Sequence, residues 1–349
     1  DSPPLWNATN FKMIFRTKAA VDVALAYDLC YAAWPEDFRS RVAAELEKRA
    51  GEFVRGGGQG FNNRPQSNWI GNTKAAGGLL ALAVRGDPGA TANADRLAAQ
   101  ARAGFFDYLA NAYGDRGWCA EGFNYMRYPM TTSGFPFLQA LRIAEGRDVV
   151  TGTPAEWIAP MYVMHLVNTP RGPYVPFFGL NYPFTGREVS GFEQMYERTR
   201  WRSGDLPMVL GSASDRYRPA VLWTLRRVVG LDGDGTFDIY KPADAAYALA
   251  NLALSAEKPA NPAQTLPLAV EDRRFGSYLF RSRWQDENDF VAALNLNADP
   301  QPATYSFQDA GSFRLYGLGV RWADQRSRRD LDWKVNISRD LENVVRVAG

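Results

Sequence analysis

The chain has 349 residues, 46% of them hydrophobic, which is enough for the core of one large domain or two medium ones. The 40 lysines and arginines nearly balance 38 aspartates and glutamates, and the absence of a dense basic stripe argues against a nucleic-acid-binding protein. No run of about 18 apolar residues predicts a transmembrane helix, and two cysteines are too few for a disulfide framework, although one bridge between Cys30 and Cys119 stays open.

The first two thirds of the sequence, from residue 15 to about 255, predict helices. Apolar residues recur at helical spacing, and glycine or proline ends most of these segments. The expected helices cover residues 19–34, 36–54, 72–88, 91–114, 132–145, 154–167, 217–229 and 243–255. Helices that follow one another in pairs are typical of an (α/α) toroid whose loops form a cleft at one end.

The pattern changes after a proline-bearing segment at 258–270, which we interpret as a linker. Beyond it, apolar residues alternate with polar ones within 274–284, 289–297 and 312–322, as in antiparallel strands. We therefore expect a mainly α chain: an incomplete toroid over 1–257, then an antiparallel, β-sandwich-like domain over 271–349. The β domain is short, so either the sheet is small or the sequence is a fragment.

Three segments in this order carry a family resemblance. They are NNRPQSNWIGNTKAAGGLLALAV from residue 62, GDRGWCAEGFNYMRY from residue 114, and the strand segments 280–297 and 308–325. Together they resemble the heparinase II/III-like polysaccharide lyases, which join an α/α toroid to a β-sandwich. The resemblance covers roughly residues 60–330 and is patchy between 130 and 270. It implies a secreted or periplasmic enzyme that acts on an acidic polysaccharide or oligosaccharide.

The family's reaction is β-elimination at a uronic acid, and it assigns a role to a tyrosine. The proton at C5 is weakly acidic, so a base must remove it while an acid protonates the leaving glycosidic oxygen. A tyrosine can serve at both ends, but its pKa of about 10 requires nearby positive charge for the base role. By the resemblance Tyr125 is the catalytic phenol, with Tyr128 on the same cleft, Arg127 between them and Glu121 orienting Tyr125 or an arginine. The competing interpretation is that both tyrosines only plug the mouth of the barrel.

The segment before the third predicted helix supplies the candidate that neutralises the substrate carboxylate. Donors aimed at that carboxylate stabilise the enolate-like charge of the transition state. The resemblance assigns this role to Asn68, which could instead be an N-cap. The other expected substrate-binding residues are polar or aromatic and lie near these motifs or in a loop at 168–186: Asn63, Arg64, Trp69, Asn72, Trp118, Arg127 and Tyr174.

The chain departs from the family at its histidines. Where many members have histidine after the catalytic asparagine, this chain has Trp69, and two histidine positions of the β domain hold Tyr305 and Phe307. The one histidine, His165, lies in an apolar run, where an interior residue is more common than a ligand. A tetrahedral zinc site needs several histidine or cysteine ligands, so we expect no metal and no other cofactor.

Two other functions stay open. A glycoside hydrolase would need two cooperating carboxylates, and Glu121 with Asp115 is the only tempting pair in the second motif. The missing histidines also suit a non-catalytic relative that binds acidic glycans.

Overall fold

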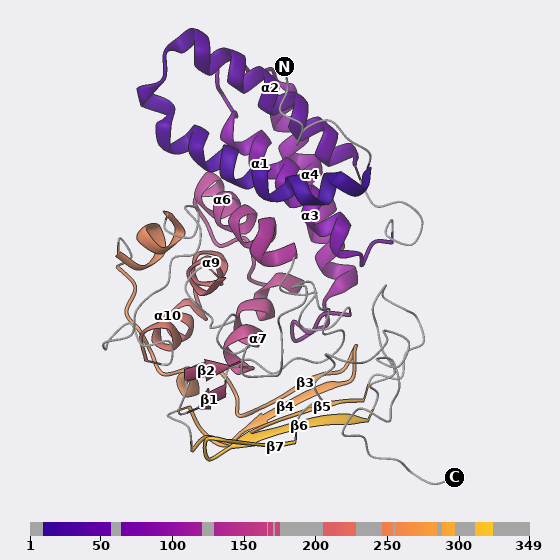
Figure 1. Cartoon of the computed structure of the whole chain (residues 1–349), viewed down its shortest axis with the longest axis vertical. Helices are drawn as coiled ribbons and strands as arrows, with labels where there is room; N and C mark the ends of the chain where they lie inside the picture. The colour runs from indigo at the N-terminus through magenta and orange to yellow at the C-terminus, as the bar shows by residue number, and fades with distance from the viewer. Residues whose placement is uncertain are drawn as a thin grey trace, which may run out of the picture. The chain divides into compact units, whose positions relative to one another are not determined.

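The computed structural model describes ten stretches of the chain: residues 10–56, 64–120, 129–165, 167–169, 172–174, 205–227, 246–253, 256–284, 288–296 and 311–323. Contacts divide the chain into two compact units (Figure 1). The first unit is Asp1–Ala112 with Met126–Thr153, and the second is Tyr113–Tyr125 with Pro154–Gly349.

The first unit is helical. Its elements are α1 (Asn10–Cys30), the 3-10 turn η2 (Tyr31–Ala33), α2 (Glu36–Arg55), α3 (Asn68–Ala83), α4 (Asn93–Ala112), the π-helix η4 (Met130–Gly134) and α6 (Phe135–Glu145). The helices predicted within residues 19–145 are confirmed, with ends that move by several residues. Local chemistry explains some of these ends: α2 has Glu36 and Asp37 in its first turn and Arg55 in its last, as the helix dipole favours.

Helix α3 is the central helix of this unit, because α1, α2, α4 and α6 all contact it. Its small residues permit the close packing. A Cβ atom added at Gly71 would lie 2.3 Å from the ring of Tyr108 on α4, and one added at Gly78 would lie 2.3 Å from the ring of Phe137 on α6. The Ala/Gly/Leu composition of this helix is thus a packing requirement.

We expect Gly71→Ala to destabilise the protein by about 1–3 kcal/mol, because the added methyl group overpacks the fully buried Tyr108 ring. The matched control is Gly104→Ala in α4, where the added Cβ meets only the flexible Lys74 side chain at 3.1 Å. An alanine inside a helix is favoured over glycine by about 0.5–1 kcal/mol, so this control should be neutral or stabilising. Urea unfolding measures both; equal stabilisation of the two variants would contradict the packing argument.

The second unit contains shorter helices and two sheets. Its helical elements are the 3-10 turn η5 (Pro154–Trp157), α7 (Ile158–Met164), α9 (Asp205–Ser212), α10 (Arg218–Arg227), the π-helix η6 (Leu249–Ala253) and the 3-10 turn η7 (Pro262–Gln264). The helix predicted over 154–167 is shorter than expected, because strand β1 (Val167–Thr169) pairs with β2 (Gly172–Tyr174) directly after it. The interpretation of 168–186 as loop is therefore wrong over these two strands, since backbone pairing forms a hairpin there.

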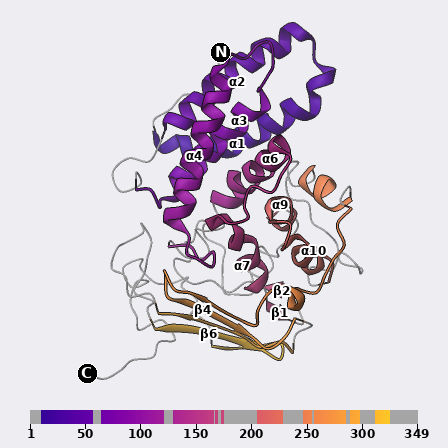
Figure 2. The ribbon, with the colours of Figure 1, turned by 180° about the vertical axis from the view of Figure 1, so that it is seen from behind.

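The larger sheet is an antiparallel meander with strand order β3-β4-β5-β6-β7 (Figure 1 and Figure 2). The strands are β3 (Ala269–Asp272), β4 (Ser277–Arg281), β5 (Val291–Asn295), β6 (Ser312–Gly317) and β7 (Val320–Ala323). Every second side chain of β4 and β5 is buried, which matches the period of two in the sequence. Leu318 and Gly319 both have positive φ in the tight turn before β7, as a two-residue hairpin of type I′ requires.

The expectation of a mainly α chain with a C-terminal antiparallel β unit is confirmed. Contacts group the sheet with α7, α9 and α10, and β3 begins inside the segment interpreted as a linker. The expected domain limits, with a toroid that ends at residue 257 and a β domain that begins at residue 271, mark where helices give way to strands along the sequence. As domain boundaries they stay a prediction. Cys30 is exposed and Cys119 is buried, and both are free thiols.

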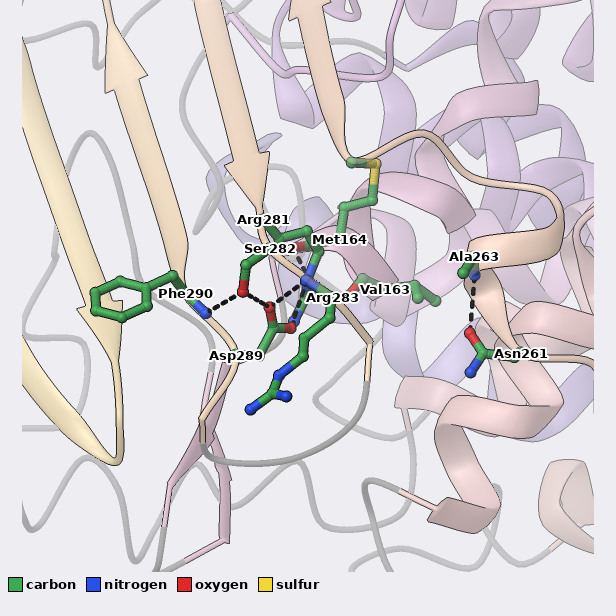
Figure 3. A network of polar contacts seen from close by, with 9 residues as sticks. All are labelled: Val163, Met164, Asn261, Ala263, Arg281, Ser282, Arg283, Asp289 and Phe290. Carbon is green, nitrogen blue, oxygen red and sulfur yellow. Dashed lines mark hydrogen bonds and ion pairs between the residues drawn. The ribbon is translucent and has the colours of Figure 1, made fainter.

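A buried ion pair fastens the sheet to α7 (Figure 3). Nη2 and Nε of Arg281 on β4 lie 2.5 and 2.9 Å from Oδ2 of Asp289, and both side chains are at most 3% exposed. Nη1 of Arg281 also donates to the carbonyl of Met164 at 3.0 Å, so one guanidinium caps the end of α7. The Trp284 ring covers this cation, with its centroid 3.9 Å from Cζ.

Candidate functional site

The first two turns of α3 carry three of the predicted site residues, Asn68, Trp69 and Asn72. The hydroxyl of Ser67 accepts a hydrogen bond from the backbone N–H of Trp69 at 3.3 Å, so Ser67 is the N-cap. The alternative interpretation of Asn68 as the cap is therefore wrong, because Asn68 is already the first helical residue.

Asn68 and Asn72 lie one turn apart and are both buried, at 1% and 0% exposure. Ser133 Oγ lies 3.1 Å from the backbone carbonyl of Asn72 and 3.2 Å from its Oδ1, and the hydroxyl donates to this pair. The amide nitrogen of Asn72 has no hydrogen-bond partner among the described residues. A buried donor of this kind is uncommon and marks a place where a further acceptor would be favourable.

Ser133 comes from the π-helix η4, which leads into α6. A π-helical turn adds a residue to the helix and is often found where a side chain must be aimed at a functional site. Here the turn places the hydroxyl against Asn72. Ser133 was not predicted as a site residue, because a serine in "MTTSG" carries no periodic signal for a π-turn.

Other residues at the start of α3 are more exposed to solvent than the two asparagines. Trp69 is partly exposed and Arg64, just before the helix, is exposed. An indole and a guanidinium beside buried amides are suited to an acidic sugar, because the ring offers an apolar face and the cation pairs with a carboxylate. The structure thus brings Asn68, Trp69 and Asn72 together on α3, with Ser133 added.

Several predicted site residues lie outside the described residues or have undescribed side chains. The first group comprises Glu121, Tyr125, Arg127, Tyr128 and Asn63, and the second is Tyr174, whose backbone is part of β2. Their roles stay predictions.

The start of the second motif, residues 114–118, forms a compact turn in the second unit. Gly114 N–H donates to the Trp118 carbonyl at 2.8 Å, and Gly117 adopts a φ of +77° that favours glycine. The carboxylate of Asp272 accepts hydrogen bonds from the backbone N–H groups of Arg116 and Trp118 at 3.0 and 3.1 Å. The turn of the second motif and the end of β3 are therefore held together by one buried carboxylate, a role that sequence spacing could not reveal.

Trp118 is 3% exposed, and its ring lies on the imidazole of His165 with the centroids 5.4 Å apart. His165 Nδ1 lies 2.9 Å from the carbonyl of Met161, and the residue is 1% exposed. Burial, with a smaller effect from the charge of Arg281, lowers the pKa of His165 to about 4. His165 is therefore neutral near pH 7, as expected of an interior histidine.

Asp272 has an unusual ionisation. Burial raises its pKa to about 6 from the ordinary value of 3.8, and the negative charge of Asp115 acts in the same direction, while the backbone donors oppose the shift. Because the pKa of Asp272 in the folded protein lies above its value in the unfolded chain, protonation of Asp272 stabilises the folded protein. This stabilisation is fully present below about pH 4 and is lost as the pH rises through about 6.

We expect Asp115→Asn to stabilise the protein at pH 7.5, because the variant removes the charge that repels ionised Asp272. The gain should stay below about 1 kcal/mol, since Asp115 is exposed to solvent. The asparagine can still accept the hydrogen bond that Arg273 N–H donates to Oδ1 at 3.1 Å. Urea unfolding at pH 4 and 7.5 should show a difference only at the higher pH, and an equal difference at both would contradict this assignment.

Within the described ranges, no group of three or more histidine, cysteine, aspartate or glutamate side chains is placed to hold a metal ion. In the same ranges, no helix is both long enough and apolar enough to cross a membrane.

Comparison with solved structures shows a fold like that of a heparinase. The chain matches a crystal structure of heparinase III with a TM-score of 0.52 and 13% identity, over 91% of this chain and 42% of that one. A heparan sulfate lyase, HepC from Pedobacter heparinus, also matches, with a TM-score of 0.31 and 15% identity, over 95% of this chain and 52% of that one.

The chain thus spans about half the length of the solved lyases that it matches. No protein-family model matches the sequence. No curated protein matches it either. At this identity the likeness to heparinase III concerns the fold alone.

Proposed function

We propose that the chain is a polysaccharide lyase that cleaves a uronate-containing glycan by β-elimination. The observation that carries the proposal is the fold shared with heparinase III over 91% of the chain. It is supported by the cluster of amides at the start of α3, where the family resemblance assigns the group that neutralises the carboxylate. A glycan substrate of this kind would be met in the periplasm or outside the cell.

In the proposed reaction the amide of Asn68 binds the uronate carboxylate, assisted by Asn72. Charge on that carboxylate opposes removal of the C5 proton, so donors that bind it stabilise the enolate-like transition state. The buried amide nitrogen of Asn72 is a donor whose hydrogen bonds are not satisfied by the described residues. A hydrogen bond made in a buried site is electrostatically stronger than the same bond in water.

The proton transfers are proposed for Tyr125. Its phenolate takes the C5 proton and the resulting phenol protonates the glycosidic oxygen, so the proton count balances over the two steps. Arg127 supplies the positive charge that favours the phenolate, Glu121 orients Tyr125 or the arginine, and Tyr128 lines the cleft. Asn63, Arg64, Trp69 and Tyr174 are the proposed contacts to neighbouring sugars. Trp118 is 3% exposed and packs on His165, so it could contact a sugar only after it is uncovered.

The proposal sets one condition on the first unit. Asn68 and Asn72 are 1% and 0% exposed in the free protein, so both side chains must be uncovered when the glycan binds. Substrate binding should therefore be accompanied by a local rearrangement around the start of α3.

A product assay on a panel of glycans tests the proposal. Alginate, heparan sulfate, chondroitin sulfate, hyaluronan and ulvan are incubated with the chain, and near-ultraviolet absorbance and new reducing ends are followed together. A lyase produces both signals, because elimination leaves a C4=C5 double bond. Reducing ends without absorbance would identify a hydrolase, and neither signal, with binding retained, would identify a glycan-binding relative.

A further inference from the structure

The second unit contains a polar pocket that none of the proposed catalytic residues lines. It has a volume of about 310 Å³ and lies between the last turns of α10 and the segment 256–264. Trp223, Arg226 and Arg227 come from the helix, and Asn261 and Gln264 come from the segment opposite. The volume is at the lower end for small-molecule sites, which suits one sugar unit better than a long stretch of chain.

The two walls of the pocket are fastened to each other. Arg218 Nε, at the start of α10, lies 3.0 Å from Oε2 of Glu257, and Ala260 N–H donates to the Pro219 carbonyl at 3.0 Å. The segment therefore follows the helix through a side-chain ion pair and a backbone hydrogen bond. A pocket with fixed walls needs little ordering when a ligand binds.

The lining has the chemistry of a site for an acidic sugar. Two guanidinium groups, those of Arg226 and Arg227, are among the groups that line the pocket. Oδ1 of Asn261 accepts a hydrogen bond from Ala263 N–H at 2.9 Å, and the Nδ2 group of the same side chain takes no part in this bond (Figure 3). Trp223 adds an aromatic ring that is partly exposed.

We propose that this pocket is a second glycan-binding subsite that holds one acidic sugar unit. Arg226 and Arg227 pair with its carboxylate or sulfate, Trp223 packs on the sugar ring, and the Asn261 and Gln264 amides hydrogen-bond hydroxyl groups. The choice of a sugar over another small anion rests on the proposed function. Arginines in a last helical turn also favour the helix dipole, so the site must be tested by binding and not by stability alone.

The test is calorimetric titration with three tetrasaccharides: hyaluronan, which carries only carboxylates, chondroitin sulfate, which adds sulfates, and neutral cellotetraose. The double variant Arg226→Gln/Arg227→Gln should bind one or both acidic probes at least tenfold more weakly at this site, since the charge-assisted hydrogen bonds to the anion are lost. Arg216→Gln is the matched control, because this exposed arginine of the same unit does not line the pocket. The stronger acidic probe identifies the anion, and cellotetraose should bind weakly to every variant.

Gln264→Glu is a second variant that keeps the size of the side chain at an exposed position and adds a repelling charge. It should weaken binding of the acidic probes and keep the thermal unfolding midpoint of the wild type. Unchanged binding in both the double variant and Gln264→Glu would overturn the proposal. Near-ultraviolet absorbance is recorded on the same samples: binding that depends on these arginines in a chain without lyase activity would refute the catalytic proposal and leave the subsite intact.

Discussion

Tyr125→Phe is expected to lower the rate of unsaturated product formation by about 10²–10⁴, the usual contribution of a positioned general acid–base group. The substitution removes one oxygen atom and keeps the aromatic ring, so binding of the glycan should change little. The loss should therefore fall on kcat more than on KM. Near-ultraviolet absorbance measures the rate, and circular dichroism verifies that the fold is retained.

Tyr128→Phe is the matched control for this prediction, since it makes the same chemical change three residues away. We expect a smaller loss from it. Arg127→Gln should move the rise in rate to higher pH, because the phenolate is then less favoured. A larger effect of Tyr128→Phe would assign the proton transfers to Tyr128 and the lining of the cleft to Tyr125. Full activity in both phenylalanine variants would reject a tyrosine base.

Arg281→Met is expected to destabilise the second unit by about 3–5 kcal/mol, because it leaves the charge of Asp289 buried without its partner. The variant also removes the donor to the Met164 carbonyl at the end of α7 and the cation beneath the Trp284 ring. Urea unfolding followed by tryptophan fluorescence measures the effect. The loss should appear as a lower midpoint.

Two further variants isolate the ion pair. Arg273→Met breaks an exposed pair with Glu271, in which the side chains are 79% and 42% exposed, and should cost less than about 1 kcal/mol. The double variant Arg281→Met/Asp289→Leu should be less destabilised than the sum of its single variants, since no charge is left buried. Additive effects, or equal effects of Arg273→Met and Arg281→Met, would contradict this account.

Periodicity in the sequence predicted much of the secondary structure, because each element buries a face of regular spacing. The alternation in 274–284 and 289–297 corresponds to β4 and β5, and the apolar spacing in 36–54 corresponds to α2. The hairpin of β1 and β2 was missed because its strands have only three residues each, too few for a period. Strand β3 was missed because it follows directly on a proline-rich segment.

The candidate site was less accessible to sequence reasoning. The motif with Asn68 and Asn72 indicated the α3 cluster, but the cap at Ser67 and the contact with Ser133 depend on local geometry and on a distant segment. Asp272 lies more than 150 residues from the turn that it binds, and no local pattern records such a contact. Motifs thus identified residue types with suitable chemistry, while their partners required the folded chain.

The central claim is that one uronate is held by an asparagine amide while a tyrosine moves its proton. A crystal structure of the Tyr125→Phe variant with a bound oligosaccharide of the preferred glycan tests this most directly. We predict that the Asn68 amide lies within hydrogen-bond distance of a uronate carboxylate, and that the edge of the substituted aromatic ring faces C5 of the same sugar. A uronate bound elsewhere, with Asn68 still covered by protein, would contradict the account.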